Sequence, residues 1–219
     1  VIGGSTEIAT LTTSMSTLTT RHGVRHVRET AVSVDVDKRL VRLASGTELP
    51  YDRLVLAPGI DFLHDLVPGL PPSAQDRVPH AWKAGPQTLL LRSQLEAMPD
   101  GGTFAMTIPA APYRCPPGPY ERACQVAWYF KRAKPRSKVL ILDANQDVTS
   151  KAGLFKKAWN EEYKGIVEYR PSHTVAGVDP ATRTVRFEVL EDLRADVLNV
   201  IPPQAAGAIA RSAGVVTAN

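Results

Sequence analysis

The sequence has few cysteines, few aromatic residues and no long apolar run, and each shortage excludes a class of protein. Two cysteines among 219 residues cannot form a zinc site by themselves. The five histidines have no spacing that would complete one, so we expect no structural metal. No apolar run approaches transmembrane length, since Leu89–Leu91 is interrupted at once by Arg92, so we expect no transmembrane segment. The hydrophobic content of 43% is ordinary for a folded core.

The charge balance does not indicate a nucleic-acid partner. The net charge is +4 and the isoelectric point is about 9.1, but the basic residues are spread along the chain. The densest basic group, 131–136, falls where a helix is expected to end, and cations suit the dipole there. Aromatic residues make up 6% of the chain and are not interleaved with the basic ones, as base stacking would require. We therefore expect no nucleic-acid binding.

The segment 113–122, Tyr-Arg-Cys-Pro-Pro-Gly-Pro-Tyr-Glu-Arg, is the most informative part of the chain. Pro119 suits the first position of a helix, where a missing N–H costs nothing. Cys115 is then expected just ahead of a helix N-terminus, where the partial positive charge favours a thiolate. Arg114 and Arg122 are close in sequence and would favour the thiolate further.

Glu121 is expected about one turn inside this helix, where it could exchange a proton with a substrate held at the sulfur. An alternative gives Glu121 only a favourable interaction with the helix dipole and makes Cys115 a small buried apolar residue. The second cysteine, Cys124, would lie further along the helix, so a bond between the two cysteines is not expected. Cys124 is predicted to be a packing residue.

The flanks of this segment predict a Rossmann-like unit. Residues 101–109 read as a buried strand, 121–134 as a helix and 138–143 as a second, parallel strand that ends in Asp143. A dinucleotide-binding unit would have Gly-x-Gly-x-x-Gly in the first turn and an acid near the position of Asp143. Here a proline-rich loop replaces the glycines, so we expect no NAD or NADP binding. A generic α/β unit without such ancestry is the alternative.

An internal repeat indicates duplicated domains. The segment 37–58 is echoed by 179–202, with matched Val-Arg, Leu, Asp, Leu and Pro residues at fixed spacing. Each copy reads as a hairpin followed by a return strand that enters a core and stops at a proline. Chance similarity of alternating valines is the alternative. The expected fold is α/β: a Rossmann-like domain with a three-layer sheet and β-meander, plus part of a duplicated FAD-domain unit.

The chain resembles the flavoprotein subunit of flavocytochrome c sulfide dehydrogenase, a periplasmic relative of sulfide:quinone reductases. The similarity extends nearly end to end, and its Cys-Pro-Pro-Gly-Pro-Tyr-Glu run is highly specific. The segments that carry it are Val1–Gly4, Tyr51–Gly59, Pro79–Gly85, Arg114–Arg122, Lys138–Asp143 and Ile201–Gln204. The resemblance implies two dinucleotide-type domains with FAD in the first, sulfide oxidation at a redox disulfide, a haem-containing cytochrome c subunit as partner, and a periplasmic location.

The resemblance also implies roles for individual residues. Cys115 matches the first cysteine of the redox pair, and Glu121 matches the acid proposed to handle protons beside it. Four residues match segments near the flavin: Pro58, Gly59, Trp82 and Lys83. Trp82 and Lys83, with His80, match a loop that returns toward the flavin and is expected to contribute packing and electrostatics.

Two parts of the family pattern have no counterpart here: the FAD fingerprint with the cysteine for covalent flavin attachment, expected upstream, and the second redox cysteine, expected downstream. The chain also begins at Val1 and ends in a Val-Val-Thr-Ala-Asn tail. We therefore expect an internal fragment that by itself is colourless and inactive. Its expected parts are an incomplete FAD domain (1–80), a second dinucleotide-type domain with the redox cysteine (81–205), and the start of a return to the FAD domain (206–219).

Three functions remain for the intact protein. The first is an FAD-dependent sulfide dehydrogenase that passes electrons to a cytochrome c subunit. The second is a sulfide:quinone oxidoreductase at a membrane surface. The third is a flavoprotein-like docking subunit without catalysis.

Overall fold

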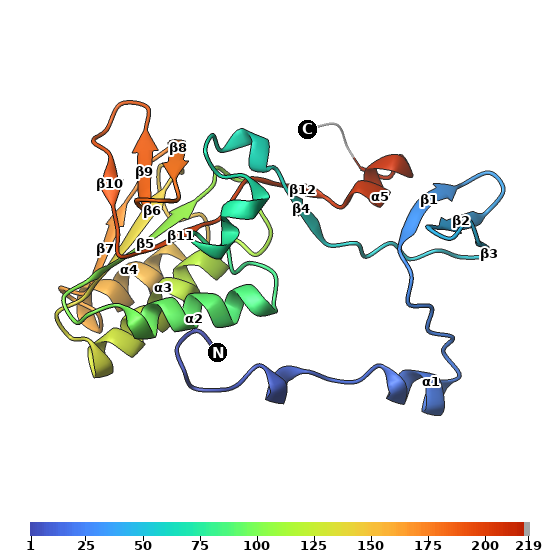
Figure 1. Cartoon of the computed structure of the whole chain (residues 1–219), viewed down its shortest axis with the longest axis horizontal. Coiled ribbons are helices and arrows are strands. Elements are labelled where there is room, and N and C mark those ends of the chain that lie inside the picture. The colour runs from blue at the N-terminus through green and yellow to red at the C-terminus, as the bar shows by residue number, and fades with distance from the viewer. Residues whose placement is uncertain (217–219) are drawn as a thin grey trace. The chain divides into compact units, whose positions relative to one another are not determined.

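The computed structural model of the chain describes residues 1–216 and forms two compact units (Figure 1). The core unit comprises residues 1–11 and 62–203, and the small unit comprises residues 12–61 with those from 204 onward. The chain passes between the units after Leu11, within β4 (Ile60–Phe62) and just before β12 (Gln204–Ala206). Residues 217–219, the end of the expected return segment, lie outside the described residues.

The division between the units comes earlier in the chain than residue 80. Val67, Leu70 and Val78 are at most 5% exposed and belong to the hydrophobic cluster of the core unit. Their burial places residues 62–80 in the core unit, with the sheet that carries the cysteine segment. The domain boundaries expected for the intact protein stay predictions.

A parallel sheet of four strands forms the centre of the core unit. In spatial order the strands are β11 (Val197–Val200), β5 (Thr103–Ile108), β6 (Lys138–Asp143) and β7 (Val167–Arg170). β5 and β6 pair from Thr103 beside Lys138 to Ile108 beside Asp143. Both faces of a parallel sheet are covered, which explains why β5 and β6 are buried almost throughout. The strand–helix–strand unit predicted from the sequence is confirmed.

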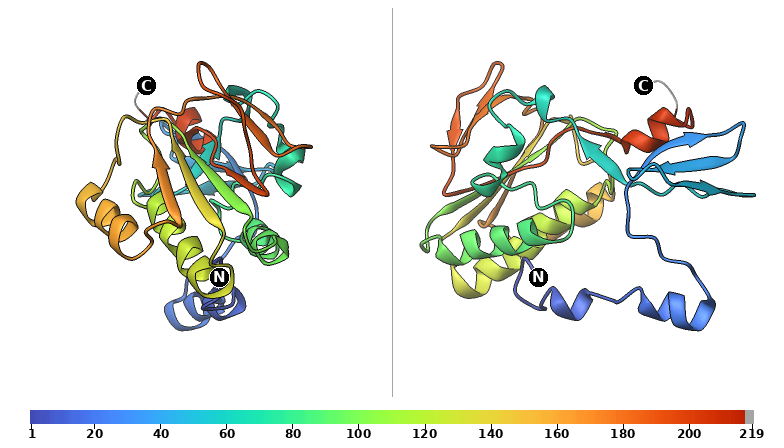
Figure 2. Two further views of the ribbon diagram at one scale, coloured as in Figure 1. Left: turned by 90° about the vertical axis from the view of Figure 1, so that its left-hand side faces the viewer. Right: turned by 45° about the vertical axis from the view of Figure 1, so that its right-hand side comes forward.

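Helices cover one face of this sheet (Figure 2). They are α2 (Pro86–Ala97), α3 (Gly118–Ala133) and α4 (Ala152–Glu161). The residues of α3 that are fully buried recur at helical spacing, as a helix that packs on a sheet requires: Tyr120, Ala123, Val126, Ala127 and Phe130. Within residues 1–216, no helix has both the length and the apolar character needed to cross a membrane.

An antiparallel meander covers the other face of the sheet. Its strands are β8 (Val175–Asp179), β9 (Thr184–Phe187) and β10 (Leu193–Arg194). Val178 and Val185 of the meander are buried in one cluster with Leu198 and Val200 of β11. The short helices η2 (His64–Leu66) and η3 (Pro72–Asp76) belong to the segment that packs on the same cluster. Helices, sheet and meander make three layers, as expected from the sequence.

The small unit contains a second antiparallel sheet and short helical segments. The strands are β1 (Ala31–Asp35), β2 (Leu40–Leu43) and β3 (Glu48–Pro50), and the helices are α1 (Ser16–His22) and α5 (Ala208–Ser212). The helix η1 (Ala9–Leu11) belongs to the core unit. The turn between β1 and β2 is closed by Asp35, whose carboxylate accepts the Lys38 N–H at 2.9 Å. The predicted hairpins at 37–38 and at 179–180 are both confirmed.

The prediction of a return strand in the first repeat copy, stopping at Pro58, is wrong. Residues 54–58 form no strand, and the Val55 side chain is 89% exposed. The matching segment of the second copy is β11, which pairs in parallel with β5. A strand needs a neighbour for its N–H and C=O groups. The described residues of the small unit contain no counterpart of β5, so the first copy stays irregular.

The start of α3 also differs from the expectation. The helix begins at Gly118 rather than at Glu121, and Pro119 occupies its second position rather than its first. Proline is tolerated at either place, because N–H groups in the first turn have no partner inside the helix. The earlier start brings the helix N-terminus closer to Cys115.

Candidate functional site

Cys115 lies just before α3, in a strained backbone conformation. Its φ is +61°, which is in the left-handed region that residues with a side chain seldom adopt. The conformation is held by a turn in which the Gly118 N–H donates to the Cys115 carbonyl at 2.8 Å. The thiol is free and exposed. Strain of this kind is concentrated at functional sites, so it supports a reactive cysteine over a buried packing residue.

Gly118 allows three groups to meet at the start of α3. A Cβ added at Gly118 would lie 3.1 Å from Cys115 Sγ and 2.8 Å from the Trp82 ring. Any side chain at this position would therefore push the sulfur and the indole apart. The structure thus brings Trp82 and Cys115, two of the predicted site residues, to the same helix terminus.

Glu121 lies in the first turn of α3, and its side chain is exposed. Its charge acts on Cys124, three positions along the helix: burial raises the pKa of that thiol, and the Glu121 carboxylate raises it further. Cys124 is free and half-buried, in keeping with its prediction as a packing residue. The proton-transfer role of Glu121 stays a prediction.

Arg122 binds the backbone of residues 79–83, which we call the 79–83 loop. Its guanidinium donates to the His80 carbonyl at 2.8 Å, to the Ala81 carbonyl, and to Asn199 Oδ1 at 2.8 Å. It also lies over the Trp82 ring, 4.9 Å from the centroid. Burial lowers the pKa of Arg122 to about 10, so the group is charged at neutral pH. The sequence suggested that Arg122 favours the thiolate, whereas the structure shows that it holds this loop.

Asn199, in β11, completes the attachment of the loop. Its Nδ2 donates to the carbonyls of Pro79 at 2.6 Å and His80 at 2.9 Å. Arg114, on the other side, donates to the Trp82 carbonyl at 2.8 Å. Asn199 was not among the residues predicted from the sequence. A polar residue within the apolar run 197–201 was the available signal, because a buried amide requires partners.

The inside of the loop is ordered by His80. Its Nδ1 accepts the Trp82 N–H at 2.8 Å, and its ring lies 4.2 Å from the Phe62 ring. Lys83 is exposed, with its Nζ 5.1 Å from the Phe62 centroid. These contacts agree with a packing and electrostatic role for His80, Trp82 and Lys83.

Asp143, at the end of β6, has no carboxylate oxygen free for a ribose. It is fully buried and accepts the hydroxyls of Tyr120 at 2.7 Å and Tyr169 at 3.1 Å. Its other oxygen accepts the Asn145 backbone N–H at 2.9 Å. A nucleotide ribose would have to displace these donors, which strengthens the expectation that pyridine nucleotides do not bind here.

Residues 88–202, more than half of the chain, match the family model described as "Sulfide dehydrogenase [flavocytochrome c] flavoprotein chain, central". The matched region contains Cys115, Glu121 and the partners of the 79–83 loop on α3 and β11. The chain belongs to this sulfide dehydrogenase flavoprotein family. The resemblance found in the sequence is confirmed.

Related proteins include sulfide:quinone oxidoreductases. The mitochondrial enzyme of Mus musculus is 23% identical over 205 residues, which are 84% of this chain and 42% of the mouse protein. The Aquifex aeolicus sulfide:quinone oxidoreductase structure has a TM-score of 0.76 at 17% identity, covering 97% of this chain and 50% of that one. A NAD-dependent persulfide reductase from A. fulgidus has a TM-score of 0.70 at 18% identity, covering 97% and 39%. The chain spans half or less of the length of each relative.

A sulfide dehydrogenase flavoprotein needs a site for its flavin, and the residues of this chain do not fit the diphosphate of FAD by themselves. The turn from β5 to α3 is filled by prolines and Cys115, so backbone amides cannot surround a phosphate there. Pro58 and Gly59 lie in the small unit, where Gly59 has a φ of +74° and its carbonyl accepts the Gly207 N–H at 3.1 Å. A flavin contact at Pro58 and Gly59 stays a prediction.

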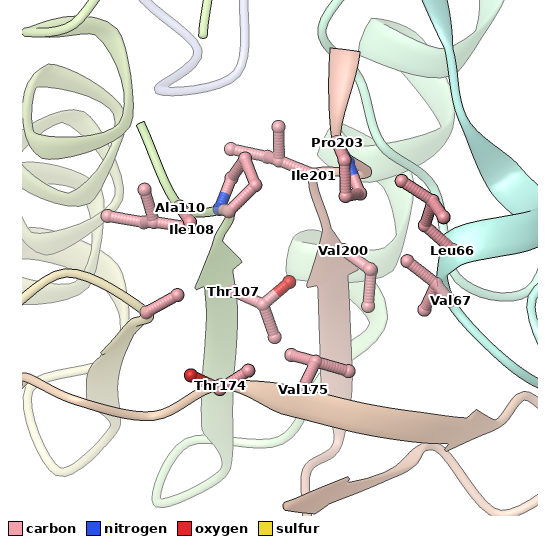
Figure 3. A pocket seen from close by; sticks show the side chains of 12 residues that line it. Leu66, Val67, Thr107, Ile108, Ala110, Thr174, Val175, Val200, Ile201 and Pro203 are labelled. Atoms are coloured by element: carbon pink, nitrogen blue, oxygen red, sulfur yellow. The ribbon is translucent and has the colours of Figure 1, made fainter. Parts of the chain in front are cut away.

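An apolar cavity of about 150 Å³ lies at the carboxyl ends of β5 and β11 (Figure 3). Val175, Val200 and Ile201 line it together with Thr107, whose buried Oγ1 has no hydrogen-bond partner. The carboxyl ends of parallel strands are common ligand sites in α/β proteins. The cavity could take a small apolar group with one polar atom. None of the predicted site residues lines it.

The acidity of His80 makes the stability of the core unit depend on pH. Burial, followed by the charges of His64, Arg122 and Lys83, lowers the pKa of His80 from 6.5 to about 4. The unfolded chain takes up the proton near pH 6.5 and the folded chain only near pH 4. The free energy of unfolding contributed by neutral His80 is therefore complete above pH 6.5 and is lost as the pH falls toward 4.

We expect His80→Asn to reduce the fall in the free energy of unfolding between pH 6.5 and pH 4. The reason is that Asn can accept the Trp82 N–H but cannot titrate. The measurement is urea unfolding at intervals between pH 4 and pH 7. His22→Asn, at an exposed position, serves as the matched control and should reproduce the wild-type slope. Equal slopes for wild type and His80→Asn would contradict the assignment.

Proposed function

We propose that the protein of which this chain is a part is an FAD-dependent sulfide dehydrogenase. It oxidises sulfide through a redox pair formed by Cys115 and a second cysteine outside this chain, and it passes the electrons to a haem-containing cytochrome c subunit in the periplasm. The observation that supports this most directly is the exposed, strained Cys115 at the start of α3, inside the region that matches the sulfide dehydrogenase family.

The chemistry at Cys115 is thiol–disulfide exchange. Hydrosulfide attacks one sulfur of the disulfide, a new S–S bond forms a persulfide, and the old S–S bond breaks. The displaced cysteine leaves as a thiolate that carries the electron pair. The flavin supplies a two-electron acceptor when it is bound.

The residues around Cys115 support this exchange in distinct ways. The N-terminus of α3 beside Cys115 carries a partial positive charge, which suits the negative charge that moves between sulfur atoms during the exchange. Glu121, one turn into the helix, is the candidate to take the proton of the persulfide or of hydrogen sulfide. The Trp82 ring and the Cys115 sulfur both lie against Gly118, so the indole lies beside the thiol.

A sulfide:quinone oxidoreductase is the second candidate. It is supported by the likeness to the Aquifex aeolicus and mouse proteins, whose names state a quinone acceptor. The two functions share the reduction of the flavin by sulfide and differ only in the acceptor that reoxidises it. Measuring flavin reduction therefore cannot distinguish them.

The acceptor can be identified with the purified full-length protein. We expect anaerobic sulfide to reduce its flavin, and a c-type cytochrome to reoxidise that flavin at least about tenfold faster than a short-chain ubiquinone analogue. Stopped-flow absorbance follows both the flavin and the haem. Faster reoxidation by the quinone would favour the second candidate. A colourless full-length protein would indicate a docking subunit and contradict the proposal.

A further inference from the structure

Asp143 is the centre of a buried hydrogen-bond network that reaches the loop carrying Cys115. This loop, residues 109–117 between β5 and α3, is called the cysteine loop below. One oxygen of Asp143 accepts the two tyrosine hydroxyls described above, and the other accepts both the backbone N–H and the Nδ2 of Asn145, at 2.9 and 2.7 Å. The carboxylate thus has four donors and is fully buried.

The first half of the cysteine loop is bound through Asn145. The Asn145 Nδ2 also donates to the Pro109 carbonyl at 3.1 Å, and its Oδ1 accepts the Ala111 N–H at 3.0 Å. Asp143 therefore orients an amide side chain that both donates a hydrogen bond to the loop backbone and accepts one from it. Because Asn145 is bound on both sides, its amide has a single favourable orientation.

The second half of the loop is bound through Tyr120, Thr149 and Tyr113. The Tyr120 hydroxyl donates to Asp143 at 2.7 Å and accepts the Thr149 backbone N–H at 3.1 Å. Thr149 Oγ1 lies 2.7 Å from the Tyr113 hydroxyl, which donates to the Pro116 carbonyl at 3.3 Å. Tyr113 has a single proton, so Thr149 is the donor to Tyr113 whenever Tyr113 donates to Pro116. The hydrogen bonds end at Pro116, the residue next to Cys115.

We propose that Asp143, with Thr149 and Tyr113, positions Cys115. The acid at the end of β6 would hold a ribose in a nucleotide-binding unit, and here it anchors both halves of the cysteine loop. The anchored loop keeps Cys115 at a φ of +61° with its sulfur at the start of α3. A role in catalysis rests on the proposed function, whereas the positioning of the sulfur does not.

The network keeps its donors over a wide pH range. Burial raises the pKa of Tyr120, Tyr113 and Tyr169, so the three hydroxyls stay protonated well above neutral pH. Asp143 is the acceptor common to two of these hydroxyls and to Asn145. Loosening of the cysteine loop by removal of a tyrosine proton is therefore not expected under physiological conditions.

The test measures the reactivity of Cys115 in the full-length protein, reduced beforehand and then treated with iodoacetamide. Trypsin separates the two cysteines into peptides 115–122 and 123–131, so mass spectrometry follows each thiol, and Cys124 is an internal reference. Thr149→Val removes the hydroxyl with little change in shape, Thr149→Ser keeps it, and Tyr113→Phe removes the donor to Pro116. Tyr129→Phe is the matched control, because the Tyr129 ring packs under Arg92, 4.2 Å from its guanidinium, away from this network.

We expect Thr149→Val and Tyr113→Phe to slow alkylation of Cys115 by about fivefold, the factor carried by one net hydrogen bond. Without this hydrogen bond the cysteine loop no longer holds the sulfur at the start of α3. Thr149→Ser and Tyr129→Phe should match the wild type, and Cys124 should not change. Unchanged Cys115 rates, failure of Thr149→Ser to rescue, or parallel slowing at Cys124 would each overturn the proposal. No sulfide is added and neither flavin reduction nor turnover is measured, so the result is independent of the proposed function.

Discussion

Replacing Cys115 by serine is expected to abolish reduction of the flavin by sulfide in the full-length protein while leaving the flavin spectrum intact. A serine hydroxyl cannot form the disulfide that sulfide attacks, so no persulfide and no displaced thiolate arise. Flavin binding should persist, because the cysteine loop does not fit the FAD diphosphate. Anaerobic stopped-flow absorbance measures the loss of the oxidised flavin bands after sulfide is added.

Two further variants complete this series. Cys124→Ser is the matched control, and its rate should stay close to that of the wild type because Cys124 is a half-buried packing residue. Glu121→Gln should slow the reduction by about 10²-fold and shift its pH profile, as loss of a general acid or base does. If Glu121 only complements the helix dipole, its replacement costs a few tenths of a kcal/mol of stability and leaves the rate unchanged. A fully active Cys115→Ser protein would exclude the proposed mechanism.

Arg122→Met is expected to destabilise the core unit by about 3 to 5 kcal/mol. Methionine fills much of the space of the arginine stem, but the Ala81 carbonyl and the amide oxygen of Asn199 lose their charged donor. The His80 carbonyl also loses the arginine but keeps the Asn199 Nδ2 as a donor. Buried acceptors left without a partner cost about 1 to 3 kcal/mol each. For a chain of this size the melting temperature should fall by roughly 10 °C.

Arg132→Met is the matched control for this measurement. Arg132 lies on the same helix and contacts an aromatic ring in the same way, 4.6 Å from the Trp128 centroid, but it is exposed. Its replacement should change stability by no more than about 0.5 kcal/mol. Differential scanning calorimetry compares the two variants, and equal melting temperatures would show that Arg122 does not hold the 79–83 loop as described.

Local patterns predicted the elements of the core unit well. The strand at 138–143 was predicted with the bounds that β6 has, and both hairpins were predicted at their observed turns. A continuous apolar run, a spacing of three and four, and turn residues between alternating strands each depend on neighbours along the chain. They could be read without knowledge of what packs against them.

The errors concern features that need a distant partner. The predicted strand at 54–58 has the same pattern as β11, yet only β11 has a neighbouring strand, β5, to pair with. The contacts of Arg122 were not predicted either: its donors are directed at a loop some forty residues earlier, at His80 and Ala81. Contacts between residues so far apart in the sequence cannot be predicted from their spacing along the chain. The effect of Arg122 on Cys115 stays a prediction.

The sequence by itself determined the α/β class, the helix that begins beside Cys115, and membership of the sulfide dehydrogenase flavoprotein family, because each depends on residue types at short fixed spacing. Only the tertiary structure decided what surrounds the thiol. It placed Trp82 against the start of α3 through Arg122 and Asn199, and it surrounded Asp143 with four donors. Buried polar groups must find partners wherever the fold brings them, and those partners lie far away along the chain.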